Sequence, residues 1–323
     1  MKIAILGAGG CFGNNLADYF SKPGYEVIGI GRSPRKPECF SLGVSYPYYN
    51  YHITYENDYV MKVLDDFEPE IIVNFAAQGE GAASFNPDDY WRFYETNCVG
   101  LAKLTGQLQK RKYLKKFVHI GTSELYGSVT KPSSEESPIL ASSPYSASKA
   151  AFDLHLMSIS KAMKFPMNII RPSNCYVEGQ QLHRIIPKAI LCALSGVKLP
   201  LHGGGLAKKS YLYSADLNKA IEIVMNNADI GEVYNCGPDE PTSIKEVVER
   251  CANIIGTTLE KLADITPDRL GQDSIYWLDS SKLKKLGWSQ SVMWDEGLAI
   301  MHGWIEKYLP QLSALPTNYT MRA

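Results

Sequence analysis

The chain has 323 residues and a mass of 35.9 kDa, with 45% apolar and 21% charged residues, a composition typical of globular rather than disordered proteins. Its 33 basic and 34 acidic residues leave a net charge of −1, which argues against a nucleic-acid or membrane-surface partner. No apolar stretch is long enough to span a membrane, and the run Ile3–Leu6 is too short for a signal peptide, so we expect a cytoplasmic protein.

The cysteines and histidines are consistent with a cytoplasmic protein that binds no metal. The seven cysteines are scattered and include no CxxC pair, which predicts free thiols in a reducing compartment. The six histidines show no spacing typical of a metal site, so we expect no metal.

Short apolar runs alternate with longer helical patterns, which predicts an α/β fold built on a doubly wound parallel sheet. Strands are expected at Lys2–Leu6, Glu26–Ile30, Ile71–Phe75, Lys116–Gly121 and Met167–Arg171, and helices at Gly13–Phe20, Asp58–Phe67, Asp88–Lys110 and Pro144–Lys164. After Pro172 the pattern changes. Helices are expected there at Ala215–Asn227, Ser243–Ile255 and Asp295–Tyr308, and a strand at Glu232–Cys236.

A glycine pattern, GxxGxxG, stands between the first predicted strand and helix, at Gly7, Gly10 and Gly13, with Cys11 and Phe12 in the same loop. Glycines here permit a tight turn and let a pyrophosphate approach the backbone, while the helix N-terminus supplies amide donors. The pattern predicts dinucleotide binding. We therefore expect a Rossmann domain over residues 1–171 and a smaller substrate-binding lobe over residues 172–323, interleaved with the last elements of the sheet.

The second strand is followed by Arg32, where an NAD-binding site usually places an acidic residue for the ribose 2′-hydroxyl. Arg35 and Lys36 follow it. A guanidinium suits a 2′-phosphate, so NADP is favoured as the cofactor, and NAD stays possible. The alternative is a solvated loop arginine without a role in binding.

Two short motifs carry the expected chemistry. Tyr145 and Lys149 lie four residues apart and share a helix face, and the lysine ammonium favours ionisation of the phenol. Thr122, Ser123 and Glu124 follow a predicted strand, at the edge where open α/β sheets bind ligands. We expect Thr122 to hydrogen-bond the hydroxyl that Tyr145 deprotonates, and Glu124 to remove a carbon-bound proton. The alternative for Glu124 is a carboxylate that stabilises a helix N-terminus.

In this order, the motifs resemble the extended short-chain dehydrogenase/reductase family over nearly the whole chain. The resemblance rests on the glycine loop, Asn74–Ala77, Thr122–Glu124, the Tyr145/Lys149 pair and Arg171–Asn174. Within that family the chain is similar to the nucleotide-sugar 4,6-dehydratases that act on GDP-mannose and dTDP-glucose.

The resemblance implies a redox-neutral reaction on a nucleotide-diphosphate sugar with a tightly bound cofactor. Tyr145 takes the C4-hydroxyl proton as hydride leaves C4, Glu124 removes the C5 proton as water leaves C6, and hydride returns to C6. The product is a 4-keto-6-deoxy sugar. The resemblance also implies further binding residues: for the cofactor Ala76, Ala77, Gln78, Asn97 and Pro172, and for the substrate Asn174, Arg184, Lys188, Lys209 and Arg269.

Departures from the family pattern leave the substrate open. Ser123 stands where the dTDP-glucose enzymes have Asp, so protonation of the leaving water falls to Glu124 or Ser123. The arginines that bind the diphosphate are weakly matched, with Lys208 and Lys209 near one, and Arg269 as a substitute. The alternatives are a nucleotide-sugar 4-epimerase or UDP-glucuronate decarboxylase of the same family, and a non-catalytic cofactor-sensing module.

The helix that carries Tyr145 has a second face, made by Ala147, Ala151, Leu154 and Ser158. We expect this face and the helix Asp88–Lys110 to form a two-fold dimer interface, with a tetramer possible.

Overall fold

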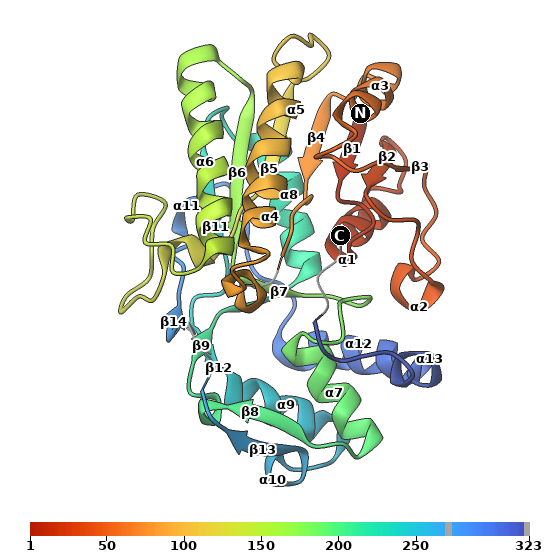
Figure 1. Ribbon diagram of the computed structural model, residues 1–323, viewed down its shortest axis with the longest axis vertical. Coiled ribbons are helices and arrows are strands. Elements are labelled where there is room, and N and C mark those ends of the chain that lie inside the picture. The colour runs from red at the N-terminus through yellow and green to blue at the C-terminus, as the bar shows by residue number, and fades with distance from the viewer. Residues whose placement is uncertain (80, 269–272, 320–323) are drawn as a thin grey trace.

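The apolar runs of the sequence assemble into one seven-stranded sheet in which every neighbouring pair of strands is parallel (Figure 1). The structure is a computed structural model that describes residues 1–79, 81–268 and 273–319. The strand order β11-β6-β5-β4-β1-β2-β3 is that of a doubly wound sheet, so the predicted fold class is confirmed. The strands are β1 (Lys2–Leu6), β2 (Glu26–Gly31), β3 (Tyr48–Asn50), β4 (Ile71–Asn74), β5 (Lys116–Ile120), β6 (Met167–Pro172) and β11 (Val233–Cys236).

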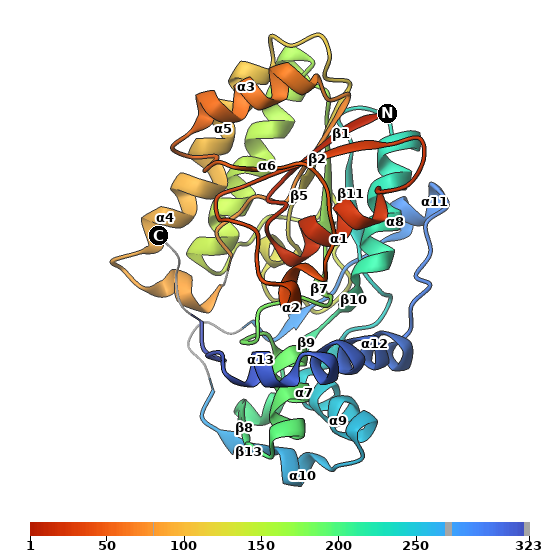
Figure 2. The same cartoon turned by 90° about the vertical axis from the view of Figure 1, so that its right-hand side faces the viewer.

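Helices cover both faces of this sheet (Figure 2). Successive strand residues point to opposite faces, so Ile3 and Ile5 of β1 enter one apolar cluster, and Ala4 and Leu6 enter the other. The first cluster is covered by α1 (Cys11–Tyr19) and α8 (Ser214–Asn227), and the second by α3 (Asn57–Phe67), α5 (Leu101–Leu108) and α6 (Pro144–Met163). Burial on both faces explains the nearly continuous apolar sequence of the strands.

The segment Asp88–Lys110, predicted as one helix, differs from the prediction. It forms α4 (Tyr90–Tyr94), a π-helical turn η2 (Glu95–Gly100) and α5. The wider turn places the fully buried side chain of Asn97 beside the loop that follows β4, and π-turns of this kind often occur near functional sites. The other predicted helices and strands agree with the structure to within about two residues, as boundaries usually do.

A separate apolar cluster forms the lobe below the carboxyl ends of the strands. Its main helices are α7 (Ile185–Ser195), α9 (Ile244–Ile255) and α12 (Trp294–Lys307), packed with β8 (Leu199–His202) and β13 (Ala263–Thr266). Because β11 and α8 return to the sheet, residues after 172 contribute to both parts. The smaller elements are α2 (Glu38–Ser41), α10 (Leu259–Leu262), α11 (Ser281–Lys285), α13 (Leu309–Ser313), β7 (Asn174–Tyr176), β9 (Lys208–Lys209), β10 (Tyr211–Tyr213), β12 (Thr242–Ser243), β14 (Ile275–Tyr276), η1 (Ala82–Phe85), η3 (Ser123–Tyr126) and η4 (Gly203–Gly205).

All seven cysteines carry free thiols. Among the described residues, no helix combines the length and apolar character needed to cross a bilayer.

Candidate active site

A cavity of about 1040 Å³ lies between the carboxyl ends of the strands and the lobe. This is the edge at which open α/β sheets bind ligands. Its walls combine residues of the glycine loop, the ends of β2, β4 and β5, the start of α6 and the upper surface of the lobe.

The glycine loop forms one wall, and Gly7, Gly10, Cys11, Phe12 and Gly13 all line the cavity. Gly7 has a φ of +80°, and a Cβ there would lie 2.6 Å from the backbone nitrogen of Ala76, so only glycine fits. The helix α1 begins after Gly10 without a side-chain cap. Its first amides, and the positive end of its dipole, are therefore available to an anion.

The end of β2 forms the adjoining rim. Arg32 lines the cavity, and its NH1 donates to Oε1 of Gln78 at 2.9 Å. Arg35 is turned away from the cavity. Its guanidinium stacks on the Tyr46 ring, 4.3 Å from the centroid, and donates to the Val44 carbonyl oxygen at 2.9 Å. Of the three expected basic residues, Arg32 and Lys36 line the cavity, whereas Arg35 stabilises its own loop.

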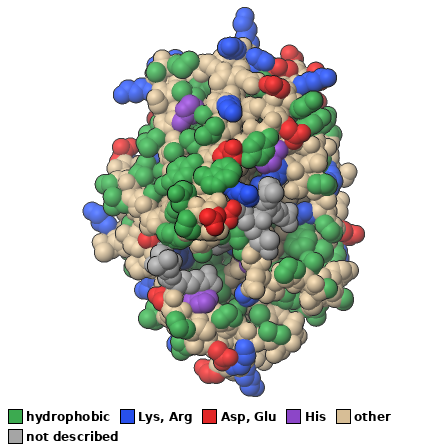
Figure 3. Space-filling model, in the orientation of Figure 1, with side chains coloured by type: hydrophobic (Ala, Val, Ile, Leu, Met, Phe, Trp, Pro, Cys, Tyr) green, Lys and Arg blue, Asp and Glu red, His purple; other side chains and the backbone are tan. Residues whose placement is uncertain are grey.

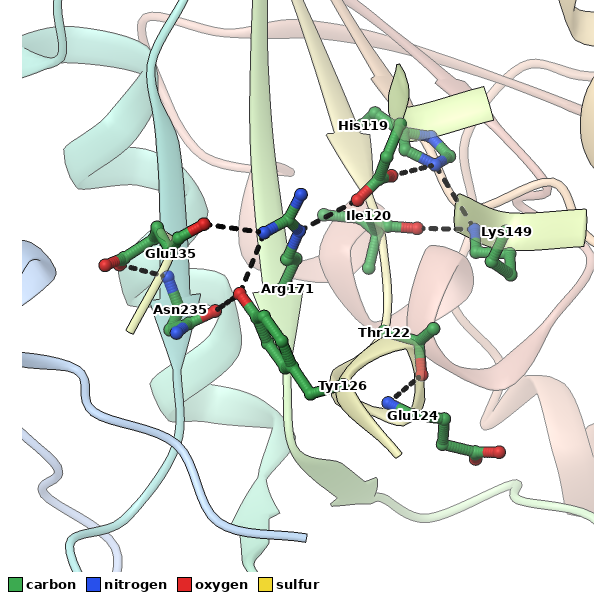
Figure 4. A network of polar contacts seen from close by, with 10 residues as sticks. His119, Ile120, Thr122, Glu124, Tyr126, Glu135, Lys149, Arg171 and Asn235 are labelled. Atoms are coloured by element: carbon green, nitrogen blue, oxygen red, sulfur yellow. Dashed lines mark hydrogen bonds and ion pairs between the residues drawn. The ribbon is translucent and has the colours of Figure 1, made fainter. Parts of the chain in front are cut away.

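The capping box at the start of α6 positions Tyr145 and Lys149. Ser143 Oγ accepts the backbone N–H of Ser146 at 3.1 Å, and Ser146 Oγ accepts the N–H of Ser143 at 3.0 Å. Tyr145, half-buried, lies between these two serines and lines the cavity. One helical turn later, Lys149 is buried, and its Nζ donates to the Ile120 carbonyl at 2.7 Å (Figure 4). Burial lowers the pKa of Lys149 to about 8.

Thr122, Ser123 and Glu124 continue β5 into the cavity wall. Thr122 Oγ1 accepts the backbone N–H of Glu124 at 3.2 Å and thereby caps the short helix η3. The half-buried Glu124 side chain extends away from the buried network of Figure 4 and lines the cavity, where a Cβ on Gly81 would lie 3.2 Å from its Oε2. Glu124 therefore stands in the first turn of a helix, as the alternative predicted, and also presents its carboxylate to the cavity.

The lobe contributes positive charge to the opposite wall. Arg184, Lys188 and Lys209 line the cavity, together with the predicted polar residue Asn174. Lys209 is buried, and its Nζ donates to the Asp273 carbonyl at 3.1 Å. Burial lowers the pKa of Lys209 to about 8, although the nearby carboxylates of Glu124 and Asp273 act in the opposite direction. The remaining predicted substrate residue, Arg269, lies outside the described residues.

Ala76, Ala77, Gln78 and Pro172 also line the cavity, whereas Asn97 lies behind its wall. The Asn97 side chain is fully buried and brackets Gln78, accepting its backbone N–H at 2.7 Å and donating to its carbonyl at 2.9 Å. Asn97 also donates to Ser148 Oγ at 2.9 Å. Asn97 thus fixes the loop after β4 against α6 instead of reaching the cavity itself.

Sequence reasoning missed a contribution from the C-terminal segment. Tyr319 lines the cavity, and its hydroxyl accepts from Gln78 Nε2 at 3.0 Å and donates to the Gly79 carbonyl at 3.2 Å. The Tyr319 ring meets His183 of the lobe edge-on at 5.2 Å. No local motif predicts this contact, because Tyr319 and Gln78 are far apart in the chain.

His52 is a second cavity residue that the sequence did not single out. Its Nδ1 accepts the Thr54 backbone N–H at 3.1 Å, so a neutral imidazole carries its proton on Nε2. Burial lowers the pKa of His52, with the nearby Arg32 acting in the same direction.

Comparison with known proteins places the chain in a family. The NAD dependent epimerase/dehydratase family matches residues 3–237, which is most of the chain. The chain belongs to this family. This membership confirms the resemblance that the motifs of the sequence indicate.

Several members of the family are similar over most of the chain. A trifunctional UDP-glucose 4,6-dehydratase/3,5-epimerase/reductase of Arabidopsis thaliana is 30% identical over 313 residues, covering 94% of this chain and 47% of the relative. The chain thus spans about half the length of the first curated relatives it matches. A mouse dTDP-D-glucose 4,6-dehydratase is 31% identical, with 78% of this chain and 72% of that protein covered.

Solved structures agree with this assignment. The dTDP-glucose 4,6-dehydratase of Bacillus anthracis, in complex with NAD, superposes with a TM-score of 0.87 at 29% identity, over 98% of this chain and 100% of the other. The dTDP-glucose 4,6-dehydratase DesIV of Streptomyces venezuelae, also with NAD, gives a TM-score of 0.89 at 25% identity, with the same coverage.

Proposed function

We propose that this protein is a nucleotide-sugar 4,6-dehydratase that works with a tightly bound nicotinamide dinucleotide. The observation that carries the proposal is the meeting of Glu124 with Tyr145 and Thr122 in one cavity. An epimerase needs only the tyrosine, whereas elimination across C5 and C6 also needs a base for the C5 proton. The relatives named as 4,6-dehydratases support the same conclusion.

The glycine loop fits the dinucleotide. At Gly7 a Cβ would lie 2.6 Å from the Ala76 backbone nitrogen, so glycine lets this loop pack closely on the loop after β4. The uncapped start of α1 supplies amide donors for two phosphates. Gly10, Phe12, Ala76, Gln78 and Pro172 would complete its binding wall. When bound, the nicotinamide supplies a reversible hydride acceptor, so the reaction needs no external oxidant.

Tyr145 and Lys149 would act on the C4 hydroxyl of the sugar. The Lys149 ammonium stabilises a phenolate at Tyr145 one helical turn away, which makes the phenol a usable base near neutral pH. Thr122 would orient the sugar hydroxyl through its own hydroxyl group. Glu124 would then take the C5 proton, which the new 4-ketone acidifies, and return a proton to the leaving C6 hydroxyl, with Ser123 beside it.

The positive charges of the lobe suit a diphosphate. Arg184, Lys188 and Lys209 line the wall that faces Glu124, and together they supply the charge that two phosphates require. Asn174 lies on the same wall, and we include Arg269 from the sequence alone. A nucleotide-diphosphate hexose is therefore the proposed substrate.

Within this function we propose NADP as the cofactor. Arg32 and Lys36 line the cavity at the end of β2, where no acidic residue is present to bind a ribose hydroxyl. The related solved structures were obtained with NAD, so this preference would distinguish the chain from those relatives.

We also propose a homodimer formed through α4, η2, α5 and α6. Hydrophobic side chains are exposed on the face of the molecule that Figure 3 shows. Trp91 of α4 and Leu154 of α6 are 48% and 52% exposed. Ser158 is also exposed there, whereas Ala147 and Ala151 are half-buried. A contiguous apolar surface on neighbouring helices commonly marks a subunit interface.

The reaction is tested with sugars deuterated at C4. The purified protein is incubated with GDP-mannose, dTDP-glucose, UDP-glucose and UDP-glucuronate, and the products are analysed by mass spectrometry and NMR. Loss of one water with deuterium at C6 supports the dehydratase. Unchanged mass with inverted C4 identifies an epimerase, and loss of carbon dioxide identifies a decarboxylase, and either outcome contradicts the proposal. Absence of any reaction, with the cofactor bound, favours a sensing module.

A further inference from the structure

A buried histidine that the proposed reaction does not use lies directly behind Lys149. His119 belongs to β5, its side chain is 0% exposed, and its Nε2 lies 3.3 Å from Lys149 Nζ (Figure 4). Phe152 packs edge-on against the imidazole, with the ring centroids 4.8 Å apart. The imidazole is therefore held in one orientation between the sheet and α6.

Asn74, the neighbour of His119 on β4, decides which ring nitrogen carries the proton. Its Oδ1 accepts the backbone N–H of Ala76 at 3.1 Å, so its Nδ2 faces His119 Nδ1, at 2.9 Å. An amide N–H can only donate, so Nδ1 is the acceptor, and a neutral ring has its proton on Nε2. Burial, together with the charges of Lys149 and Arg171, holds the pKa of His119 well below its usual value, which keeps the ring neutral.

Asp153 lies beside both His119 and Arg171, and of these two only Arg171 is within hydrogen-bond distance of its carboxylate. His119 Nε2 lies 3.6 Å from Asp153 Oδ1, an oxygen that has no hydrogen-bond partner among the described residues. The other oxygen of Asp153 accepts from Arg171 Nε at 2.9 Å. Because His119 presents an N–H to Lys149 instead of a lone pair, it provides no acceptor for an ammonium, and its dipole opposes the positive charge.

We propose that His119 is a positioning residue of the reaction centre: its Nε2–H, oriented by Asn74, faces Lys149 and Asp153 and sets how readily Lys149 loses its proton. The inference rests on the proposed function, because it is through its charge beside Tyr145 that Lys149 affects the reaction. The charged groups around the imidazole are Lys149 and Asp153 of α6 and Arg171 of β6. Of these, the Asp153 carboxylate favours the ammonium form of Lys149. In our proposal the imidazole N–H opposes that form.

The tautomer is tested without substrate. The protein is labelled with 15N-histidine, and the ring nitrogens of His119 are assigned by comparison with His119→Gln and followed by NMR between about pH 6 and pH 9. We expect a ring that does not titrate, with its proton on Nε2. A proton on Nδ1, or a ring that titrates in this range, overturns the inference and leaves the proposed function untouched.

The effect on Lys149 is tested by the pH profile of sugar oxidation. His119→Gln places an amide near the position of Nε2, where its oxygen can accept from Lys149. The alkaline limb of the single-turnover rate with dTDP-glucose or UDP-glucose is expected to move up by about one pH unit. Asp153→Asn, which removes the carboxylate, should move it down. An alkaline limb in His119→Gln that matches the wild type overturns the inference.

His155→Gln is the matched control. His155 belongs to the same helix and stacks on the Phe152 ring at 5.7 Å, but its Nε2 lies 3.2 Å from Thr105 Oγ1, away from Lys149. Its pH profile is expected to match that of the wild type, and an upward shift equal to that of His119→Gln would also overturn the inference. If wild-type protein oxidises none of GDP-mannose, dTDP-glucose and UDP-glucose, the proposed function fails, and the NMR experiment still decides the tautomer.

Discussion

Arg32 and Gln78 meet at the rim of the cavity, where the guanidinium NH1 donates to the side-chain Oε1 at 2.9 Å. The bond joins the end of β2 to the loop after β4. Gln78 is in turn held by Asn97 from the π-turn and by Tyr319 from the C-terminal segment. Arg32 is thus anchored at the place where a Rossmann fold receives the adenosine ribose.

Replacing Arg32 by Ala is expected to weaken NADP⁺ binding by roughly 10- to 100-fold, because a charge-assisted hydrogen bond contributes about 1.5–3 kcal/mol. NAD⁺ has no 2′-phosphate, so its affinity should change little. Both dissociation constants are measured by fluorescence titration. Arg35→Ala is the control, since Arg35 stacks on Tyr46 outside the cavity and should leave the ratio of the two constants unchanged. Equal losses for NADP⁺ and NAD⁺ in Arg32→Ala would contradict the assignment.

Lys209 makes diphosphate binding dependent on pH. Its pKa is lowered to about 8 by burial, so above that pH the amine is neutral and no longer attracts phosphate. The dissociation constants of UDP and dTDP, measured by calorimetry, should rise above about pH 8, approaching tenfold per pH unit. Lys209→Arg should abolish this rise, because a guanidinium stays charged. The adjacent and exposed Lys208, changed to Arg, should preserve it. A flat wild-type curve would remove Lys209 from the phosphate site.

The same lysine affects stability with the opposite sign. Between about pH 8 and pH 10.4 an unfolded Lys209 binds a proton that the folded protein does not. The free energy of unfolding therefore gains from this group as the pH rises through that window. In urea unfolding, Lys209→Met should show a smaller increase in stability between these pH values than the wild type.

Glu124→Gln separates oxidation from elimination. The amide cannot take the C5 proton, whereas Tyr145, Lys149 and Thr122 keep their places. We expect the variant to oxidise C4 and accumulate reduced cofactor, visible by its absorbance, while loss of water falls by at least about 100-fold. Thr122→Ala is the comparison, because it should slow oxidation itself. Normal dehydration by Glu124→Gln would rule out the proposed role of Glu124.

Local sequence predicted six of the seven strands of the sheet, and most of the predicted site residues line the cavity. Strands buried on both faces, such as Ile71–Asn74, have an unmistakably apolar sequence, and the glycine loop and the Tyr145/Lys149 pair are each contained in one segment. The strand Tyr48–Asn50 was not predicted, because it is short and its residues are partly exposed. Helix α7 was also missed. Most of its residues are apolar, so it lacks a clear amphipathic pattern.

Contacts between segments that are distant in the chain could not be predicted from the sequence. Nothing local indicates that Tyr319 reaches Gln78, or that Asn74 orients His119, since each contact depends on how the chain packs in three dimensions. Arg35 is the converse case, in which the sequence suggests a contact that tertiary packing prevents. Its sequence position beside Arg32 suggests a phosphate ligand, but stacking on Tyr46 removes it from the cavity. Residue type predicts which chemistry is available, whereas tertiary packing decides which side chains carry it out.

If the proposed dimer forms through α4 and α6, substitutions on these helices should lower the mass of the protein in solution. Trp91 of α4 and Leu154 of α6 are exposed on neighbouring helices, so a double variant with Trp91→Glu and Leu154→Glu places repelling charges in the interface. The wild type should have the mass of two chains by light scattering, and the double variant that of one. Leu206→Glu, at a 77% exposed lobe residue, should remain dimeric. A monomeric wild type at micromolar concentration would remove the proposal.

Gly7 and Gly43 form a matched pair for testing the phosphate loop. Both have positive φ, +80° and +72°, so Ala at either position pays the left-handed penalty of about 1–2 kcal/mol. At Gly43 a Cβ meets no heavy atom within 4 Å, whereas at Gly7 it would lie 2.6 Å from the Ala76 nitrogen. Gly7→Ala should therefore lower the free energy of unfolding by clearly more than Gly43→Ala. The variant should also lose dinucleotide binding, because the loop after β1 and the loop after β4 must move apart. Urea unfolding and cofactor titration measure the two effects, and equal losses of stability would show that the close approach at Gly7 is relieved at no cost.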